Sequence, residues 1–285
     1  MDNNNVIHQA RYVLKSNWIQ AVKILKEALE KDATNIDIYE ELADIFVEMK
    51  NYDQALEYLQ KAIAIDPSKV GIRFKLANMY LELDQPIDAI EHYDKLDDVF
   101  PETYFNKALA YYLIHQIDDA IDCLKELLRI TNKIERAYFF LIELLLLYNR
   151  FDECEKYILE TKRQFGDSPQ LSYMLANNYF KQFKPLQAYN EFLKALPGHK
   201  DETKIYQLLG ETAANIGQIE MAITHLKDGI RECRNKKPLI LDLIQLKKKN
   251  NQLNNTADLR KLVSEFDDNT AKMILNYYYS LRKKD

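Results

Sequence analysis

The sequence predicts an all-α fold, a right-handed superhelical solenoid of tandem helix–turn–helix repeats with a C-terminal capping helix. Three observations predict it: a composition that favours helices, a column of small residues that recurs about every 34 positions, and prolines that avoid helix interiors. The 285 residues include only six glycines and seven prolines. A hydrophobic content of 47% provides enough apolar side chains for a large core.

The best copy of the repeat spans residues 36–69 and shows two helical periodicities. The apolar stripe of its first helix is Tyr39, Leu42, Ala43 and Phe46, and that of its second is Tyr52, Ala55, Leu59 and Ala62. Because each set falls on one helical face, the segment predicts a helical pair that ends before Pro67. The pattern resembles the tetratricopeptide repeat. That resemblance implies stacked helix pairs whose first helices line a concave surface that binds polypeptides.

A column of small residues carries the repeat along the whole chain. The twentieth place of each repeat holds Ala21, Ala55, Ala89, Ala120, Cys154, Ala188, Ala222 and Ala257, and the eighth holds Gln9, Ala43, Ala77, Ala108, Ile142, Ala176, Gly210 and Gln245. Small side chains at these places let two helices of one repeat cross closely. Ala28, Ala62, Ala195 and Gly229 are expected to do the same between neighbouring repeats.

Taken in order, the predicted repeats cover 2–35, 36–69, 70–100, 101–134, 135–168, 169–202, 203–237 and 238–267, and the capping helix covers 269–284. Repeat one lacks several marker residues, repeat three is shortened, and repeat eight keeps only the helical periodicity. The capping helix is expected to turn Met273, Ile274, Tyr277, Tyr278 and Leu281 to one side. No linker divides the chain, which predicts one continuous solenoid.

Prolines and one glycine mark the predicted helix boundaries. Pro86 and Pro185 fall at the starts of second helices, where a missing N–H group costs nothing. The five others, Pro67, Pro101, Pro169, Pro197 and Pro238, are placed between repeats. Gly217 lies in the turn within repeat seven and is expected to cap the preceding helix.

Charge and composition favour a cytoplasmic protein that binds other proteins. The net charge is −5, with acidic residues concentrated in the first half and lysines and arginines in the last fifth, so a nucleic-acid partner is not expected. The longest apolar run, residues 137–148, is too short to span a bilayer, and the N-terminus lacks a secretory pattern. The three cysteines, Cys123, Cys154 and Cys233, have no metal-ligand spacing, which suits a reducing compartment.

No pattern typical of catalysis is present in the sequence. The five histidines are dispersed over different repeats, and six scattered glycines cannot form a phosphate-binding loop. Acidic pairs such as Asp118-Asp119 fall at helix N-termini, where they stabilise the helix dipole. We therefore expect no enzyme activity, no metal and no cofactor.

The concave places of repeats three to six hold an aromatic set that favours a binding groove. Its residues are Phe74, Asn78, Leu81, Phe105, Asn106, Leu109, Tyr112, Arg136, Phe139, Phe140, Tyr173, Asn177 and Phe180. The aromatic rings would take a peptide's side chains, and Asn78, Asn106 and Asn177 would pair with its backbone. The concave places of repeat two instead hold Asp37, Glu40, Glu41, Asp44 and Glu48, which we expect to form a solvated acidic wall.

Two alternatives to peptide binding compete for the aromatic set. The first is self-association, in which a homodimer forms through these rings or through the basic C-terminal end. The second is internal packing, in which other residues of the same chain cover the rings. The resemblance also allows a carboxylate-binding site like that of the cofactors of heat-shock chaperones. Asn78, Asn106 and Arg136 match that site, but Phe74 and Phe140 stand where it needs cationic residues. The sequence therefore favours an apolar or aromatic peptide or helix as the ligand.

Overall fold

The computed structural model describes residues 3–96, 100–250, 263, 264, 266 and 268–282. Within these ranges the chain forms sixteen α-helices, one short 3-10 helix and no strand, so the all-α prediction is confirmed. The chain divides into two compact parts, Met1–Ala137 and Tyr138–Asp285, which we call the N-terminal and C-terminal parts. The prediction of one continuous solenoid, with its repeat boundaries, stays a prediction.

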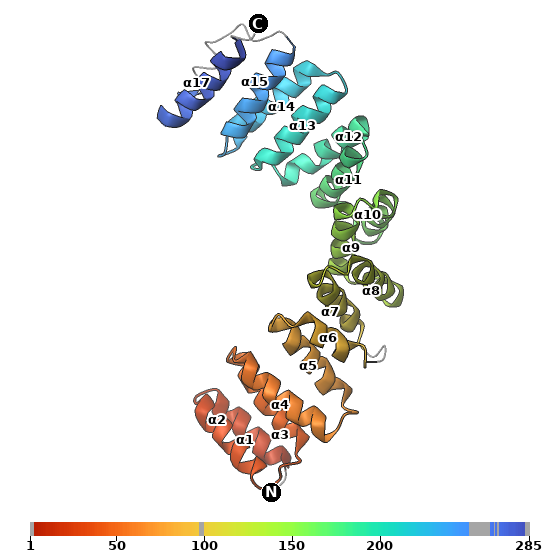
Figure 1. Cartoon of the computed structure of the whole chain (residues 1–285), viewed down its shortest axis with the longest axis vertical. Helices are drawn as coiled ribbons and strands as arrows, with labels where there is room; N and C mark the ends of the chain where they lie inside the picture. The colour runs from red at the N-terminus through yellow and green to blue at the C-terminus, as the bar shows by residue number, and fades with distance from the viewer. Residues whose placement is uncertain (1–2, 97–99, 251–262, 265, 267, 283–285) are drawn as a thin grey trace. The chain divides into compact units, whose positions relative to one another are not determined.

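The N-terminal part consists of four antiparallel helix pairs (Figure 1). The pairs are α1 (Asn3–Leu14) with α2 (Trp18–Leu29), α3 (Ile36–Glu48) with α4 (Tyr52–Ile65), α5 (Val70–Glu82) with α6 (Pro86–Tyr93), and α7 (Pro101–Leu113) with α8 (Ile117–Ile130). Helix α9 (Glu135–Leu147) crosses the division after Ala137. Each pair contacts the next through its second helix, which is the stacking that the repeat pattern predicts.

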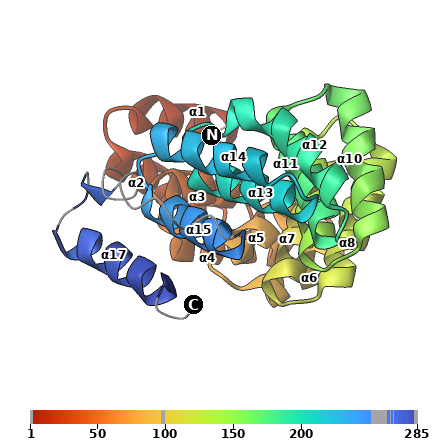
Figure 2. The same cartoon turned by 90° about the horizontal axis from the view of Figure 1, so that it is seen from above.

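The C-terminal part continues the same pairing. It contains α10 (Phe151–Phe165), α11 (Pro169–Lys181) with α12 (Pro185–Ala195), η1 (Leu196–Gly198), α13 (Thr203–Asn215) with α14 (Ile219–Glu232), α15 (Lys237–Lys249) and α17 (Asp268–Arg282). Figure 2 shows α13, α14 and α15 side by side, and each of the three contacts the other two. One core cluster runs from Ala176 on α11 to Tyr278 on α17.

The column of small residues lies where helices cross, as predicted. Every described member of the twentieth place, from Ala21 to Ala222, is fully buried, and Ala257 lies outside the described residues. Gly229 of α14 is closely packed on two sides: a Cβ atom built there would lie 2.6 Å from Tyr206 of α13 in the same repeat and 2.9 Å from Leu239 of α15 in the next. A larger residue would therefore push α14 away from α13 and α15.

The turns within repeats share one backbone conformation. The second residue after the end of the first helix has a left-handed φ in six repeats: Lys50, Asp84, His115, Asn149, Phe183 and Gly217. In each case the next amide donates to a carbonyl five residues earlier, as Lys184 N does to Tyr179 O at 3.0 Å. These are Schellman caps. The predicted glycine cap at Gly217 is confirmed, with φ +80°.

The other helix boundaries also follow the sequence. Four helix N-termini are capped by a side chain that accepts a hydrogen bond from a backbone N–H group: those of Asn17, Asn35, Asn51 and Ser168. Pro101 and Pro169, which we placed between repeats, are the first residues of α7 and α11, where a missing N–H group has no cost.

The chain ends with a helix packed on repeat eight. Ile274 and Tyr278 of α17 are buried in the C-terminal core, as the capping prediction requires. Met273, which we placed on the same side, is 43% exposed, so that assignment is wrong: the buried face follows the spacing of four between Ile274 and Tyr278. The expected second helix of repeat eight falls largely on 251–262, outside the described residues.

Candidate functional site

A stripe of side chains spaced i, i+4 and i+7 recurs on three first helices. We call it the first-helix stripe, and its members are Phe74, Asn78 and Leu81 on α5, Phe105, Leu109 and Tyr112 on α7, and Tyr173, Asn177 and Phe180 on α11. All nine are half-buried. A spacing of four and three places the members of each helix on one face. The stripe is therefore partly accessible to solvent and rich in rings.

The same places in repeat two hold acidic residues that are paired with cations of neighbouring repeats. Lys75 Nζ on α5 lies 2.8 Å from Glu40 and 2.7 Å from Asp44 on α3, and Arg11 forms a bidentate pair with Glu41. The expectation of a solvated acidic wall is thus wrong for these three carboxylates. Burial lowers the pKa of Lys75, but the bonds to Asp44 and Glu40 outweigh burial and raise the pKa.

On α5, the ring and the carboxamide of the stripe are held by neighbouring helices. Phe74 lies 5.0 Å from Phe100 and 6.4 Å from Tyr93, measured between ring centroids. The Tyr93 hydroxyl donates to Asn78 Oδ1 at 2.5 Å, and Asn106 Nδ2 donates to the same oxygen at 2.9 Å. Asn78 and Asn106 thus come together, with their amide planes fixed before any ligand arrives.

On α7, Phe105 has a cation above its ring. The guanidinium of Arg136, at the start of α9, lies 4.5 Å from the ring centroid, an arrangement that contributes roughly 0.5–1 kcal/mol at an exposed site. Arg136 is exposed and Phe105 is half-buried. The contact orders the guanidinium, which keeps donors for a carboxylate or a backbone carbonyl.

Phe139 and Phe140 lie on the segment of α9 that belongs to the C-terminal part, and both are half-buried. The predicted site residues therefore form two sets. One set, from Phe74 to Arg136, lies on the N-terminal part, and the other, from Phe139 to Phe180, lies on the C-terminal part.

On α11, two stripe rings rest on one buried ring. Tyr173 and Phe180 meet Phe192 of α12 edge to face, with centroids 5.9 and 6.4 Å apart, and Phe192 is fully buried. Asn177 Nδ2 donates to the Tyr173 carbonyl at 2.9 Å. The Oδ1 atom of Asn177 can therefore still accept a hydrogen bond. The aromatic surface of α11 has a rigid support.

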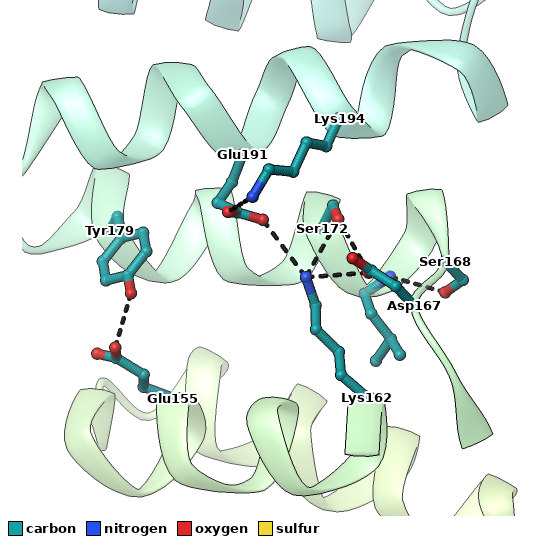
Figure 3. Close-up of polar contacts among 9 residues, drawn as sticks. Glu155, Lys162, Asp167, Ser168, Ser172, Tyr179, Glu191 and Lys194 are labelled. Carbon is teal, nitrogen blue, oxygen red and sulfur yellow. Dashed lines mark hydrogen bonds and ion pairs between the residues drawn. The ribbon is translucent and has the colours of Figure 1, made fainter. Parts of the chain in front are cut away.

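An ion-pair network fixes α11 and α12 against α10 (Figure 3). Lys162 Nζ of α10 lies 3.2 Å from Ser172, 3.4 Å from Glu191 and 3.0 Å from Asp167, and Lys194 lies 2.5 Å from Glu191. Burial raises the pKa of Asp167, but the hydrogen bond and charge of Lys162, together with hydrogen bonds from Ser168 and Ser172, outweigh burial and lower the pKa. Removing one partner would leave a poorly solvated charge, so the network defines the register of α10 on the next pair.

The C-terminal part also contains two joined clefts. The apolar cleft, of about 750 Å³, is lined by Phe151, Phe180, Phe183 and Pro185. The polar cleft, of about 530 Å³, is lined by Lys204, Gln207, Asp242, Gln245, Lys249 and Asn250. Glu211 and Asn215 line both. Of the predicted site residues, Phe180 alone is among the lining residues of these two clefts.

Models of the tetratricopeptide repeat match residues 13–57, 46–112 and 101–134. These matches cover the pairs α3–α4, α5–α6 and α7–α8, and the later helices pair in the same way. The chain is a tetratricopeptide repeat protein. Such repeats generally serve protein–protein interaction and are typically not catalytic. No curated protein sequence matches the chain.

Solved structures with this repeat are similar to the chain in fold. The C-terminal part of a tetratricopeptide repeat protein from Cytophaga hutchinsonii has a TM-score of 0.64 and 16% identity, covering 85% of this chain and 95% of that one. A tetratricopeptide repeat protein from Parabacteroides merdae has a TM-score of 0.54 and 20% identity, covering 85% and 97%. YrrB, described as having an unusual peptide-binding site, has a TM-score of 0.55 and 15% identity, covering 64% and 95%.

The titratable groups of this tetratricopeptide repeat protein serve packing. Burial raises the pKa of Cys123 to about 11 and of Cys154 to about 12, which keeps both thiols protonated near neutral pH. His225 Nε2 lies 2.9 Å from the Tyr189 hydroxyl, and burial lowers its pKa. In the part of the chain that the structure describes, no group of His, Cys, Asp and Glu side chains could hold a metal ion.

Sequence reasoning missed the two clefts and the conformation of Phe183. The stripe places of repeat seven, Gln207, Glu211 and Ala214, are not among the predicted site residues, yet they line the polar cleft. A signal for Phe183 was available: it stands 34 residues before Gly217, the glycine whose cap was predicted.

Among the described helices, none combines the length and the apolar character that a membrane span requires.

Proposed function

We propose that this protein is a non-catalytic scaffold or adaptor that binds a peptide or helix of a partner protein on its first-helix stripe. The observation that carries the proposal is the recurrence of half-buried rings at one spacing on α5, α7 and α11. Repeats two and seven hold charged or amide side chains at the first two of these places and the ring-free residues Val47 and Ala214 at the third, so ring-rich places are confined to the middle repeats.

The support behind the rings favours binding. Residues that contribute most to protein interfaces are large rings and arginines in ordered positions. Phe192 holds Tyr173 and Phe180, and Phe100 holds Phe74, so little side-chain entropy is lost when a partner covers these rings. The paired amides of Asn78 and Asn106 offer backbone-like hydrogen bonds beside the apolar surface.

The test is affinity capture with a paired substitution of two predicted site residues, Phe105 of the stripe and Phe139 of α9, which holds the same place in repeat five. Phe105→Ala with Phe139→Ala removes one ring from each set, and each change removes apolar contact of about 2 kcal/mol or more if the ring meets the partner. We expect the double variant to lose the partner that the wild type captures from lysate, with an unchanged helical circular dichroism spectrum. The partner is identified by mass spectrometry and its affinity is then measured by calorimetry.

The matched control is Tyr12→Ala with Ile19→Ala, which removes two exposed apolar side chains outside the stripe. This variant should capture the partner as the wild type does. Equal capture by the Phe105 and Phe139 double variant would refute the proposal. Light scattering distinguishes self-association from binding of a different protein. If the protein is a dimer that these substitutions dissociate, the partner is a second copy of the chain.

A further inference from the structure

Phe183 is the exception among the six left-handed turn residues. The other five are lysine, aspartate, histidine, asparagine and glycine, whereas Phe183 is a large apolar residue at φ +56°. A left-handed backbone is unfavourable for an L-residue, and only glycine and asparagine or aspartate adopt it readily. Phe183 is also 92% exposed, so no internal packing offsets the strain. Residues held in a strained backbone conformation concentrate at functional sites.

The strained turn presents the Phe183 ring at the mouth of the apolar cleft. Phe151, Phe180 and Pro185 line the cleft with it, and Leu186, directly after Pro185, is 56% exposed. The Schellman bonds, Phe183 N to Phe180 O at 3.1 Å and Lys184 N to Tyr179 O at 3.0 Å, hold the turn in place. The backbone of Phe183 is thus fixed, and the exposed residue that it carries lines a cleft large enough for a bulky side chain.

The polar cleft continues the apolar one through Glu211 and Asn215, and its chemistry suits a polypeptide backbone. Gln207 Nε2 donates to Asp242 and Asn250 Nδ2 donates to the Leu246 carbonyl, so each amide is oriented with its oxygen left as an acceptor among the described residues. Lys204 and Lys249 supply donors. A backbone presents alternating N–H and C=O groups, which require both kinds of partner.

We propose that the joined clefts bind an extended peptide of a partner protein, with one large apolar side chain in the apolar cleft against Phe183. This inference rests on the proposed partner-binding function and adds a second contact region to it. The joined clefts hold three lysines, Lys181, Lys204 and Lys249, and two carboxylates, Glu211 and Asp242; this single excess positive charge is too small to favour a polyanion, and the amides disfavour a lipid chain. Residues of the first helices α11, α13 and α15 line the clefts, and α13 and α15 contact each other.

The test begins with a probe of defined composition. A phage library of random twelve-residue peptides is selected on the full-length protein, and enriched peptides are synthesised with a fluorophore for anisotropy titration. We expect a shared motif with one aromatic or leucine residue. Phe183→Asn should weaken binding at least tenfold, because asparagine keeps the left-handed turn and removes the ring. Asn215→Leu should weaken binding about fivefold or more.

The matched control is His115→Asn, which also introduces asparagine at the equivalent turn, in repeat four, and His115 is not among the residues that line the clefts. It should leave the affinity unchanged. The inference is overturned if no peptide is enriched, or if Phe183→Asn changes the affinity less than twofold. It is also overturned if Phe183→Asn converts a dimer to a monomer in light scattering, since a second copy is then the occupant.

The two proposals fail separately. Loss of peptide binding only with Phe74→Ala and Phe105→Ala would retain the first-helix stripe and reject the joined clefts. Loss only with Phe183→Asn and Asn215→Leu would retain the joined clefts and reject the stripe.

Discussion

Replacing Phe183 by glycine should make the protein more stable while weakening the peptide binding proposed for the joined clefts. The left-handed backbone costs phenylalanine roughly 1–2 kcal/mol, and glycine avoids this cost. Glycine in turn loses roughly 0.5–1 kcal/mol through the greater freedom of the unfolded chain. Because the side chain is 92% exposed, its removal costs little packing. The balance is a gain of about 0.5–1 kcal/mol.

The assay is native hydrogen exchange followed by mass spectrometry on a peptide covering residues 179–188. The amides of Phe183 and Lys184 are hydrogen-bonded within the turn, so they exchange when this repeat opens. A gain of about 0.5–1 kcal/mol corresponds to exchange slowed about two- to fivefold, since 1.4 kcal/mol is a factor of ten. A local readout suits a repeat protein, whose repeats open separately.

Gly217→Ala is the reverse substitution at the equivalent turn and provides the control. A Cβ atom there meets nothing within 4 Å, so its cost comes from the backbone at φ +80° alone. Exchange of residues 213–222 should therefore speed up by a similar factor. Faster exchange around Phe183→Gly, or unchanged exchange around Gly217→Ala, would refute the assignment of strain to these turns.

Three further predictions follow from the packing. Lys75→Met should lower the free energy of unfolding by about 1 kcal/mol at neutral pH. Because the folded state raises the pKa of Lys75, this difference should persist below pH 10.5 and vanish as the pH rises through the folded pKa. Urea unfolding across that pH range measures it. Gly229→Ala should destabilise repeat seven by about 1–3 kcal/mol, because its Cβ atom would clash with neighbouring side chains. Gly71→Ala should instead stabilise α5 by up to about 1 kcal/mol, because a Cβ atom at Gly71 meets nothing within 4 Å. Equal effects of the two substitutions on hydrogen exchange would contradict the packing. Cys154, whose pKa burial raises to about 12, should stay unmodified by iodoacetamide at pH 8 until urea unfolds the chain, and modification of the folded protein would contradict its burial.

The fold was predictable because its determinants recur. The small residue at the twentieth place, the asparagine caps and the prolines act through local geometry, which is the same in each repeat. The half-buried rings of α5, α7 and α11 were likewise available from helical spacing alone. A repeat pattern therefore predicts both the helix pairs and the face that each first helix presents.

What the sequence could not provide depends on contacts between repeats. The acidic residues of α3 look solvated in one repeat, and only stacking brings Arg11 and Lys75 onto them. Asn78 and Asn106 were assigned to a ligand, and stacking joins them to each other. The apolar cleft requires residues of three repeats and the polar cleft residues of two, and the exposure of Phe183 follows from the direction of its turn.

The most direct test of the central claim is side-chain footprinting of the stripe with and without the captured partner. Hydroxyl radicals label accessible rings, and mass spectrometry locates the label. We expect the partner to reduce labelling of Phe74, Phe105, Tyr112, Tyr173 or Phe180 several-fold, while Tyr12, which is 84% exposed and outside the stripe, keeps its labelling. Unchanged labelling of all five stripe rings in the saturated complex would contradict the claim that the first helices bind the partner.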